Sequence, residues 1–179
     1  MPRLFTGIEI PSGIADALDR LRGGLRSARW IDAENYHITL RFLGDIDDRA
    51  ASDAAAILAD IRKPAFDLHL DGLAAFGGRK PRAVIASVAA EQALLDLQAE
   101  HERLMRRIGL APETRKFTPH VTLARLRNSS SLEVADYLAA RGFFRTAPFK
   151  VARFVLFSSR ASTGGGPYVV EESYPLVSV

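Results

Sequence analysis

Apolar and polar residues are arranged along the chain in two kinds of pattern, one typical of strands and one of helices. Short apolar runs and alternating stretches predict strands over residues 3–10, 37–44, 66–73, 82–90, 120–126, 149–159 and 167–176. Apolar residues at helical spacing predict helices that begin at Ser12 and that cover residues 48–62, 91–108 and 130–142. Several strands follow one another through short turns, such as the one expected within 162–167, so the pattern favours an α+β fold with antiparallel or mixed sheets.

One four-residue pattern, His-aliphatic-Thr-Leu, occurs twice, at residues 37–40 and 120–123. A shuffled chain of this composition would contain about 0.01 copies. Each copy lies on a predicted strand that is followed by a predicted helix. We therefore expect an internal duplication, with two pseudo-symmetric lobes around a central cleft in a single domain that spans residues 1–179.

Strand geometry decides which side chains of the two motifs lie together. Residues at i and i+2 of a strand share a face, so His37 and Thr39 share one face, and His120 and Thr122 share another. The residues that alternate with them are expected on the opposite, buried faces, namely Tyr36, Ile38, Leu40 and Phe42 around the first motif and Val121 and Leu123 in the second. Each motif should present a polar pair on an apolar backing.

Two histidines that face one substrate can divide acid–base work, because histidine titrates near neutral pH. One imidazole can activate an attacking water while the other protonates the departing oxygen, which suits in-line displacement at phosphorus. The neighbouring threonine hydroxyls can bind the non-bridging phosphate oxygens. The pattern leaves open which histidine is the acid. The alternative interpretation, two ordinary strand histidines, fits a single motif better than a matched pair.

Composition excludes several other chemistries. The chain has no cysteine, which removes disulfides, thiolate metal sites and a cysteine nucleophile. Two histidines make a poor zinc site, and Glu34 is the one acidic residue within three positions of either motif histidine, so we expect no metal and no cofactor. The net charge of +3 permits a local contact with a polyanion without requiring one.

No apolar run approaches the roughly 20 residues that cross a bilayer, and the first residues lack the apolar core of a signal peptide. We therefore expect a cytoplasmic protein that does not enter a membrane, and a monomer.

The two motif blocks, "RWIDAENYHITLRFLGD" and "FTPHVTLAR", resemble those of the bacterial and archaeal RNA 2',3'-cyclic phosphodiesterases, also called 2'-5' RNA ligases. These enzymes belong to the two-histidine phosphoesterase superfamily. The resemblance extends, less specifically, to "RLFTGIEIP" at the start and to "VLFSSRASTGGGPYVVEESYPL" at the end. It implies a bilobal α+β fold, a metal-independent site, opening of terminal RNA cyclic phosphates to 2'-phosphomonoesters, and 2'-5' ligation of RNA halves as a second activity.

The resemblance also implies roles for individual residues. His37 corresponds to the proton donor for the departing 3'-oxygen and His120 to the base. Arg125 corresponds to an arginine near the phosphate, although strict alternation places it opposite His120, so it needs a bulge or a strand end to turn inward. By alternation, Arg41 lies on the His37 face and could steer phosphate.

Further candidates are less specific. Phe5 and Tyr168 could stack on a base, with core packing as the favoured alternative for Phe5. Residues 77–80 and Arg115–Lys116 could contact an RNA backbone, although charged loops are usually only solvated. His69 lies on the polar face of its strand, and His101 is expected at the edge of an apolar helix stripe.

Three functions remain open from the sequence. The first is a metal-independent cyclic phosphodiesterase that acts on RNA ends. The second keeps the chemistry but takes small cyclic nucleotides or 2'-5' linkages as substrates. The third is a non-catalytic module that binds RNA ends, which would not need to retain all four polar motif residues.

Overall fold

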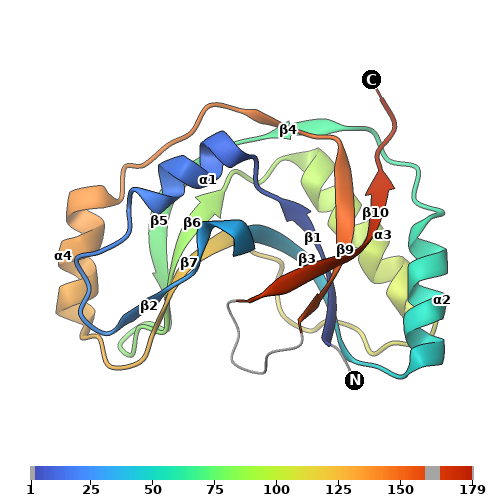
Figure 1. The fold of residues 1–179 in the computed structure, drawn as a ribbon, viewed down its shortest axis with the longest axis horizontal. Coiled ribbons are helices and arrows are strands. Elements are labelled where there is room, and N and C mark those ends of the chain that lie inside the picture. The colour runs from blue at the N-terminus through green and yellow to red at the C-terminus, as the bar shows by residue number, and fades with distance from the viewer. Residues whose placement is uncertain (1–2, 160–165, 179) are drawn as a thin grey trace.

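The computed structural model describes residues 3–159 and 166–178 and contains helices, antiparallel strands and two lobes (Figure 1). Most of the turn expected within 162–167 therefore lies outside the described residues. The helices are α1 (Ser12–Asp19), the 3-10 helix η1 (Ala33–Asn35), α2 (Asp48–Leu58), α3 (Gln92–Arg107) and α4 (Ser131–Arg141). The strands are β1 (Arg3–Glu9), β2 (Ala28–Trp30), β3 (His37–Asp45), β4 (Phe66–Leu68), β5 (Leu70–Phe76), β6 (Ala83–Val88), β7 (His120–Leu126), β8 (Phe149–Val151), β9 (Arg153–Ser159) and β10 (Tyr168–Pro175).

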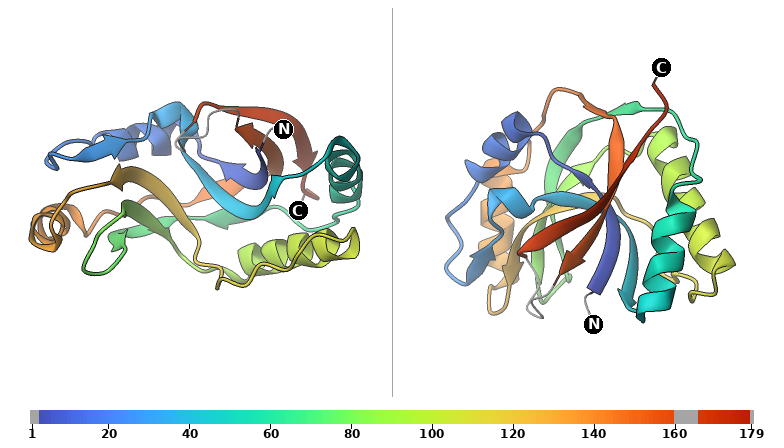
Figure 2. Two further views of the ribbon diagram at one scale, coloured as in Figure 1. Left: turned by 90° about the horizontal axis from the view of Figure 1, so that it is seen from below. Right: turned by 45° about the vertical axis from the view of Figure 1, so that its right-hand side comes forward.

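An 8-stranded sheet runs through both lobes in the order β10-β9-β1-β3-β7-β6-β5, with β2 paired to β7. The first lobe contributes β10, β9, β1 and β3, and the second contributes β7, β6, β5 and β2. The pair Ile38–Val121 joins β3 to β7 in antiparallel sense and so joins the two halves. Figure 2 (left) shows the arched path of these strands, with the two halves inclined to each other. The predicted α+β fold with two lobes is confirmed.

The helices cover the two ends of the molecule. Figure 1 shows α1 and α4 at one end and α2 and α3 at the other. α4 begins with a capping box, because the Ser130 side chain accepts from the Glu133 backbone and the Glu133 side chain accepts from the Ser130 backbone. Between the helices and the sheet lies a continuous apolar core that contains Ile38 and Val121, so the backs of both motif strands are held rigidly.

Two predicted strands are each divided in the structure. Residues 66–73 were expected as one strand, but the chain breaks at His69, where β4 leaves the small sheet that it forms with β8 and β5 enters the large one. Residues 149–159 divide in the same way between β8 and β9. Apolar periodicity continues through both breaks because both halves are buried, so the pattern does not reveal the change of partner.

The end of one helix also differs from the sequence-based expectation, and two short elements are additional to it. α2 ends at Leu58 rather than near residue 62, because the chain then extends toward Pro64, which forms a parallel bridge with Val177. The short elements β2 and η1 were not predicted. They have only three residues each, which is too short to show a period.

Candidate active site

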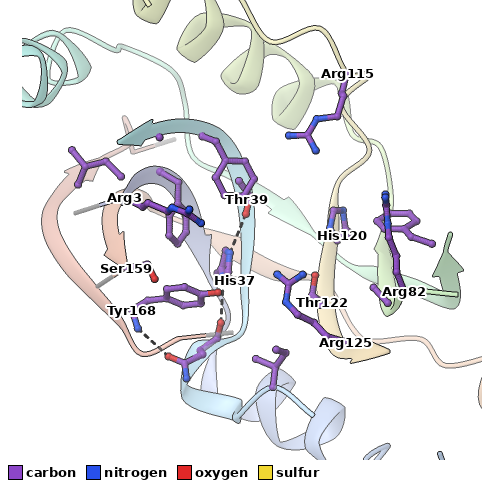
Figure 3. Close-up of a pocket in the computed structure, with 18 of the residues that line it drawn as sticks. Arg3, His37, Thr39, Arg82, Arg115, His120, Thr122, Arg125, Ser159 and Tyr168 are labelled. Atoms are coloured by element: carbon purple, nitrogen blue, oxygen red, sulfur yellow. Dashed lines mark hydrogen bonds between the residues drawn. The ribbon is translucent and has the colours of Figure 1, made fainter. Parts of the chain in front are cut away.

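The two motifs lie side by side at the junction of the lobes. Because Ile38 pairs with Val121 in antiparallel sense, the flanking polar residues of one strand lie opposite those of the other, His37 near Thr122 and Thr39 near His120. All four side chains line one cavity of about 760 Å³ (Figure 3), a volume within the usual range of ligand sites. The approximate two-fold relation between the motifs places one histidine on each side of this cavity.

The two imidazoles are held in the same way. His37 Nδ1 lies 2.9 Å from the carbonyl oxygen of Asn35, and His120 Nδ1 lies 2.6 Å from that of Thr118. In each case the acceptor is the carbonyl two residues earlier. A carbonyl can only accept, so Nδ1 carries the proton and the Nε2 of each neutral ring is left as an acceptor. His37 Nε2 accepts from the Thr39 hydroxyl, at 3.0 Å.

Burial and nearby charge make both imidazoles easier to deprotonate. Burial lowers the pKa of His37 to about 4, and the charges of His120 and Arg125 act in the same direction against the bond to Asn35. The pKa of His120 is also lowered, first by burial and then by Arg125. Both rings are therefore neutral at pH 7 in the free protein, and each can accept a proton at Nε2.

Aromatic rings surround the histidines unequally. The ring of His37 lies 5.0 Å from those of Phe5 and Tyr168 and 5.5 Å from that of Phe157. Among the described residues, the ring of His120 has one such neighbour, Phe76, at 4.8 Å. Phe5 itself is buried in a cluster with Val155 and Phe157 and still lines the cavity. The His37 side of the cavity is therefore the more apolar one.

Cationic side chains line the rest of the cavity. Arg125 and Arg82 both line it, Arg125 reaching toward His37 and Arg82 lying beside His120 (Figure 3), and neither has an ion-pair partner in the part of the chain that the structure describes. Arg3 pairs with Asp45 at 3.6 Å, and Arg115 pairs with Glu113 at 3.3 Å, both at exposed positions. Two unpaired guanidinium groups beside two neutral imidazoles form a site suited to an anion such as a phosphate.

A bulge in β7 explains how Arg125 reaches the cavity. β6 and β7 lose register between Val84 and Ile85, because Leu123 has no partner on β6. The extra residue puts Leu123 and Ala124 both on the buried side and returns Arg125 to the face of His120. The bulge that the sequence required for this placement is thus present.

An equivalent bulge in β3 overturns two expectations. Leu40 has no partner on β1, so Arg41 turns away from His37 into the interior, where it is 6% exposed. Its Nε donates to Glu102 at 2.5 Å, and Nη2 donates to the carbonyl of Ala111. Phe42, expected to be buried, is instead 50% exposed and lines the cavity. Placing Arg41 on the His37 face was wrong.

Several cavity residues were missed by sequence reasoning, namely Arg3, Asn35, Phe42, Phe76 and Arg82. Asn35 is buried, and besides its carbonyl bond to His37 its Oδ1 accepts from the backbone of Tyr168 at 3.3 Å. A Cβ at Gly166 would lie 2.4 Å from the Asn35 side chain, so a glycine is needed there. The sequence feature that could have identified Asn35 is its position two residues before the motif histidine.

Neither a metal cluster nor a membrane-crossing helix is found in the described part of the chain. Within residues 3–159 and 166–178, no group of three or more His, Cys, Asp or Glu side chains could hold a metal ion. Over the same residues, no helix has the length and apolarity needed to cross a membrane. Residues 77–80 and His69 are not among the residues that line the cavity. His101 is fully buried rather than at the edge of its stripe.

The chain is similar in sequence and in fold to known phosphoesterases. An RNA 2',3'-cyclic phosphodiesterase of Aquifex aeolicus is 30% identical over 96% of this chain and 96% of that protein. One from Aeropyrum pernix is 38% identical, and that match spans 57% of this chain and 59% of the relative's length. A crystal structure of Escherichia coli LigT complexed with 3'-AMP is 26% identical with a TM-score of 0.79, and it covers 98% of this chain and 99% of that one.

A family model described as LigT like Phosphoesterase matches the chain twice, at residues 8–86 and 84–168. Each match contains one of the two histidine motifs, as an internal duplication requires. The chain belongs to the LigT-like phosphoesterase family.

Proposed function

We propose that the chain opens RNA 2',3'-cyclic phosphate ends to 2'-phosphomonoesters by paired-histidine catalysis without a metal, acting as a single two-lobed domain. The observation that carries the proposal is the pair of imidazoles that share one cavity, each with Nδ1 bound to a carbonyl and with Nε2 as the nitrogen that can accept a proton. Relatives named RNA 2',3'-cyclic phosphodiesterase support the choice of substrate.

In the proposed mechanism, water attacks phosphorus from the His120 side. His120 Nε2 takes a proton from the water as the new P–O bond forms. The bond from phosphorus to the 3'-oxygen breaks on the opposite side, and His37 delivers a proton to that oxygen. Each proton transfer contributes about 10²–10⁴-fold to the rate.

His37 must carry a proton before it can act as the acid. In the free protein its pKa of about 4 keeps it neutral. The bound phosphate is an anion, which raises the pKa of an adjacent imidazole. Substrate binding would therefore charge His37, while the Thr39 hydroxyl turns from Nε2 toward a phosphate oxygen.

The remaining polar groups would hold the phosphate itself. Thr39 and Thr122 can donate their hydroxyls to the two non-bridging oxygens, one from each strand. Arg125 can add a charge-assisted hydrogen bond that strengthens as negative charge builds up in the transition state. Phe5 and Tyr168 would then border the nucleoside on the His37 side.

The test uses an oligonucleotide that ends in a 2',3'-cyclic phosphate, with EDTA present throughout. We expect His37→Ala and His120→Ala each to reduce kcat by about 10²–10⁴-fold, whereas the matched control His69→Ala stays near wild type. The wild-type product should be a 2'-phosphate, which phosphorus NMR distinguishes from a 3'-phosphate. Full turnover by both cavity variants, or activity that EDTA abolishes, would contradict the proposal.

A second candidate is hydrolysis of small 2',3'-cyclic nucleotides. It is favoured by the Escherichia coli relative, which was crystallised with the mononucleotide 3'-AMP. A comparison of kcat/KM between cyclic mononucleotides and cyclic-ended oligonucleotides decides between the two. A binding module without turnover, the third possibility, is disfavoured by the complete set of His37, Thr39, His120 and Thr122 on one cavity.

A further inference from the structure

The cavity has a second branch of about 280 Å³ that opens beside His120. Phe42, Phe76, Arg82 and Arg115 line both the branch and the main cavity, so the two adjoin. His37 does not line the branch. Its further wall consists of residues from α3 and from the loop before β7, namely Gln98, Glu113, Lys116 and Phe117.

The lining of this branch has the chemistry that single-stranded nucleic acid needs. Phe42, Phe76 and Phe117 offer aromatic rings, and base–aromatic contact tolerates any sequence. Lys116 has no ion-pair partner within the described ranges, and Arg115, which Figure 3 shows above His120, is exposed and held only by Glu113. Rings interleaved with available cations suit a nucleoside followed by a phosphate.

The position of the branch decides which nucleoside it can receive. In the proposed reaction the nucleophile approaches phosphorus on the His120 side, opposite the 3'-oxygen that leaves on the His37 side. A group in the branch therefore lies where the nucleophile must lie. If water is replaced there by a ribose 5'-hydroxyl, the nucleoside that carries it would occupy the branch.

We propose that this branch binds the nucleotide whose 5'-oxygen attacks or leaves phosphorus, with Phe117 against its base and Lys116 on its next phosphate. The inference rests on the proposed function and assigns residues to the second RNA strand. In joining, the 5'-hydroxyl proton passes to His120, the 5'-oxygen bonds to phosphorus, the bond to the 3'-oxygen breaks, and that oxygen takes the proton from His37. Cleavage of a 2'-5' linkage is the same step reversed.

The test compares two substrates on one enzyme. A 2'-5'-linked trinucleotide fills the main cavity and the branch, whereas 2',3'-cyclic AMP fills only the main cavity. We expect Lys116→Ala and Phe117→Leu to lower kcat/KM for the trinucleotide by about five- to 100-fold and to change that for cyclic AMP by less than about twofold. Lys150→Ala, an exposed lysine on β8 outside both cavities, is the matched control.

A binding measurement makes the result independent of turnover. Cleavage needs the 3'-hydroxyl next to the scissile phosphate, so a trinucleotide that is 3'-deoxy at that ribose is an uncleavable probe. Its Kd should rise in Lys116→Ala and its salt slope should fall by about one, while the Kd of 2'-AMP is retained. Equal losses on both ligands, or no loss on the trinucleotide, would overturn the inference. A wild-type enzyme that binds both ligands but opens no cyclic phosphate would instead refute the proposed function.

Discussion

Substituting two arginines, Arg125 and Arg41, one at a time gives the most direct test of the site. Arg125 enters the cavity without an ion-pair partner in the described residues, whereas Arg41 is buried against Glu102. Substituting each by glutamine, which keeps most of the length and removes the charge, should therefore damage different properties. Arg125→Gln should impair catalysis and Arg41→Gln should impair stability.

The magnitudes follow from the surroundings of each side chain. A hydrogen bond to a charged group is worth about 1.5–3 kcal/mol, so Arg125→Gln should lower kcat/KM for a cyclic-ended oligonucleotide by roughly 10- to 150-fold. Arg41 is 6% exposed and Glu102 is 20% exposed. Removing one partner of a fully buried pair costs about 3–5 kcal/mol, and solvent at Glu102 reduces this to roughly 2–4 kcal/mol. For a chain of this length that corresponds to a fall in Tm of about 5–15 °C.

The assay measures kcat/KM and Tm for both variants and for Arg127→Gln, an exposed arginine two residues beyond Arg125 that lies outside the cavity lining. Arg125→Gln should also move the pH profile, because the Arg125 charge lowers the pKa of both motif histidines. Its removal raises both pKa values, so both limbs shift to higher pH. The reasoning is that the bulges in β3 and β7 turn Arg41 into the core and Arg125 into the cavity. It would be refuted if Arg41→Gln lost activity at full stability while Arg125→Gln stayed active.

Three further predictions concern the pH optimum, substrate binding and the pH dependence of stability. The kcat/KM optimum of the wild type should lie below pH 6.5, since burial lowers the pKa of both His37 and His120, and an alkaline optimum would contradict this. Asn35→Ala should raise KM about fivefold by releasing the backbone of Tyr168, with kcat retained because the carbonyl that holds His37 remains, and steady-state kinetics separates the two. His101 should lower the free energy of unfolding by about 2.5 kcal/mol as the pH drops from 6.5 to 4, because the unfolded side chain binds a proton that the buried ring, with a pKa of about 4, does not bind, and His37, whose pKa is also about 4, should add a similar amount. His101→Leu should lose less over this range in urea titrations, and an unchanged pH dependence would contradict the assignment.

Strand alternation predicted which faces the motif side chains occupy, because each motif residue lies within two positions of its partner. Strand alternation needs no tertiary information as long as the ladder is regular, and it correctly paired His37 with Thr39 and His120 with Thr122. It failed at the first irregularity, one residue beyond each threonine. A bulge depends on how a neighbouring strand pairs, as β1 does with β3, and no local pattern in β3 reveals that pairing.

The cavity residues that come from other elements could not be predicted from the sequence, for a related reason. Phe76 and Arg82 flank the turn between β5 and β6. Phe76 contacts the His120 ring and Arg82 lines the cavity because β6 pairs with β7. Nothing in their immediate neighbours distinguishes them from ordinary hairpin residues. The same holds for Arg115 and Lys116, which could be noticed as a charged pair although the cavity that they line could not be foreseen.

The two lobes supply equivalent imidazoles, and the walls around them make the pair unequal. Both rings have the same tautomer and the same carbonyl anchor, which is what the duplicated strands provide. His37, enclosed by three aromatic rings, has the more strongly lowered pKa. A weaker base is a stronger acid once it is charged, so the apolar wall agrees with the proposed mechanism, in which His37 donates the proton and His120 takes one from the nucleophile. The two histidines have the same motif, so the difference between their pKa values comes from their surroundings, on the His37 side from Phe5, Phe157 and Tyr168.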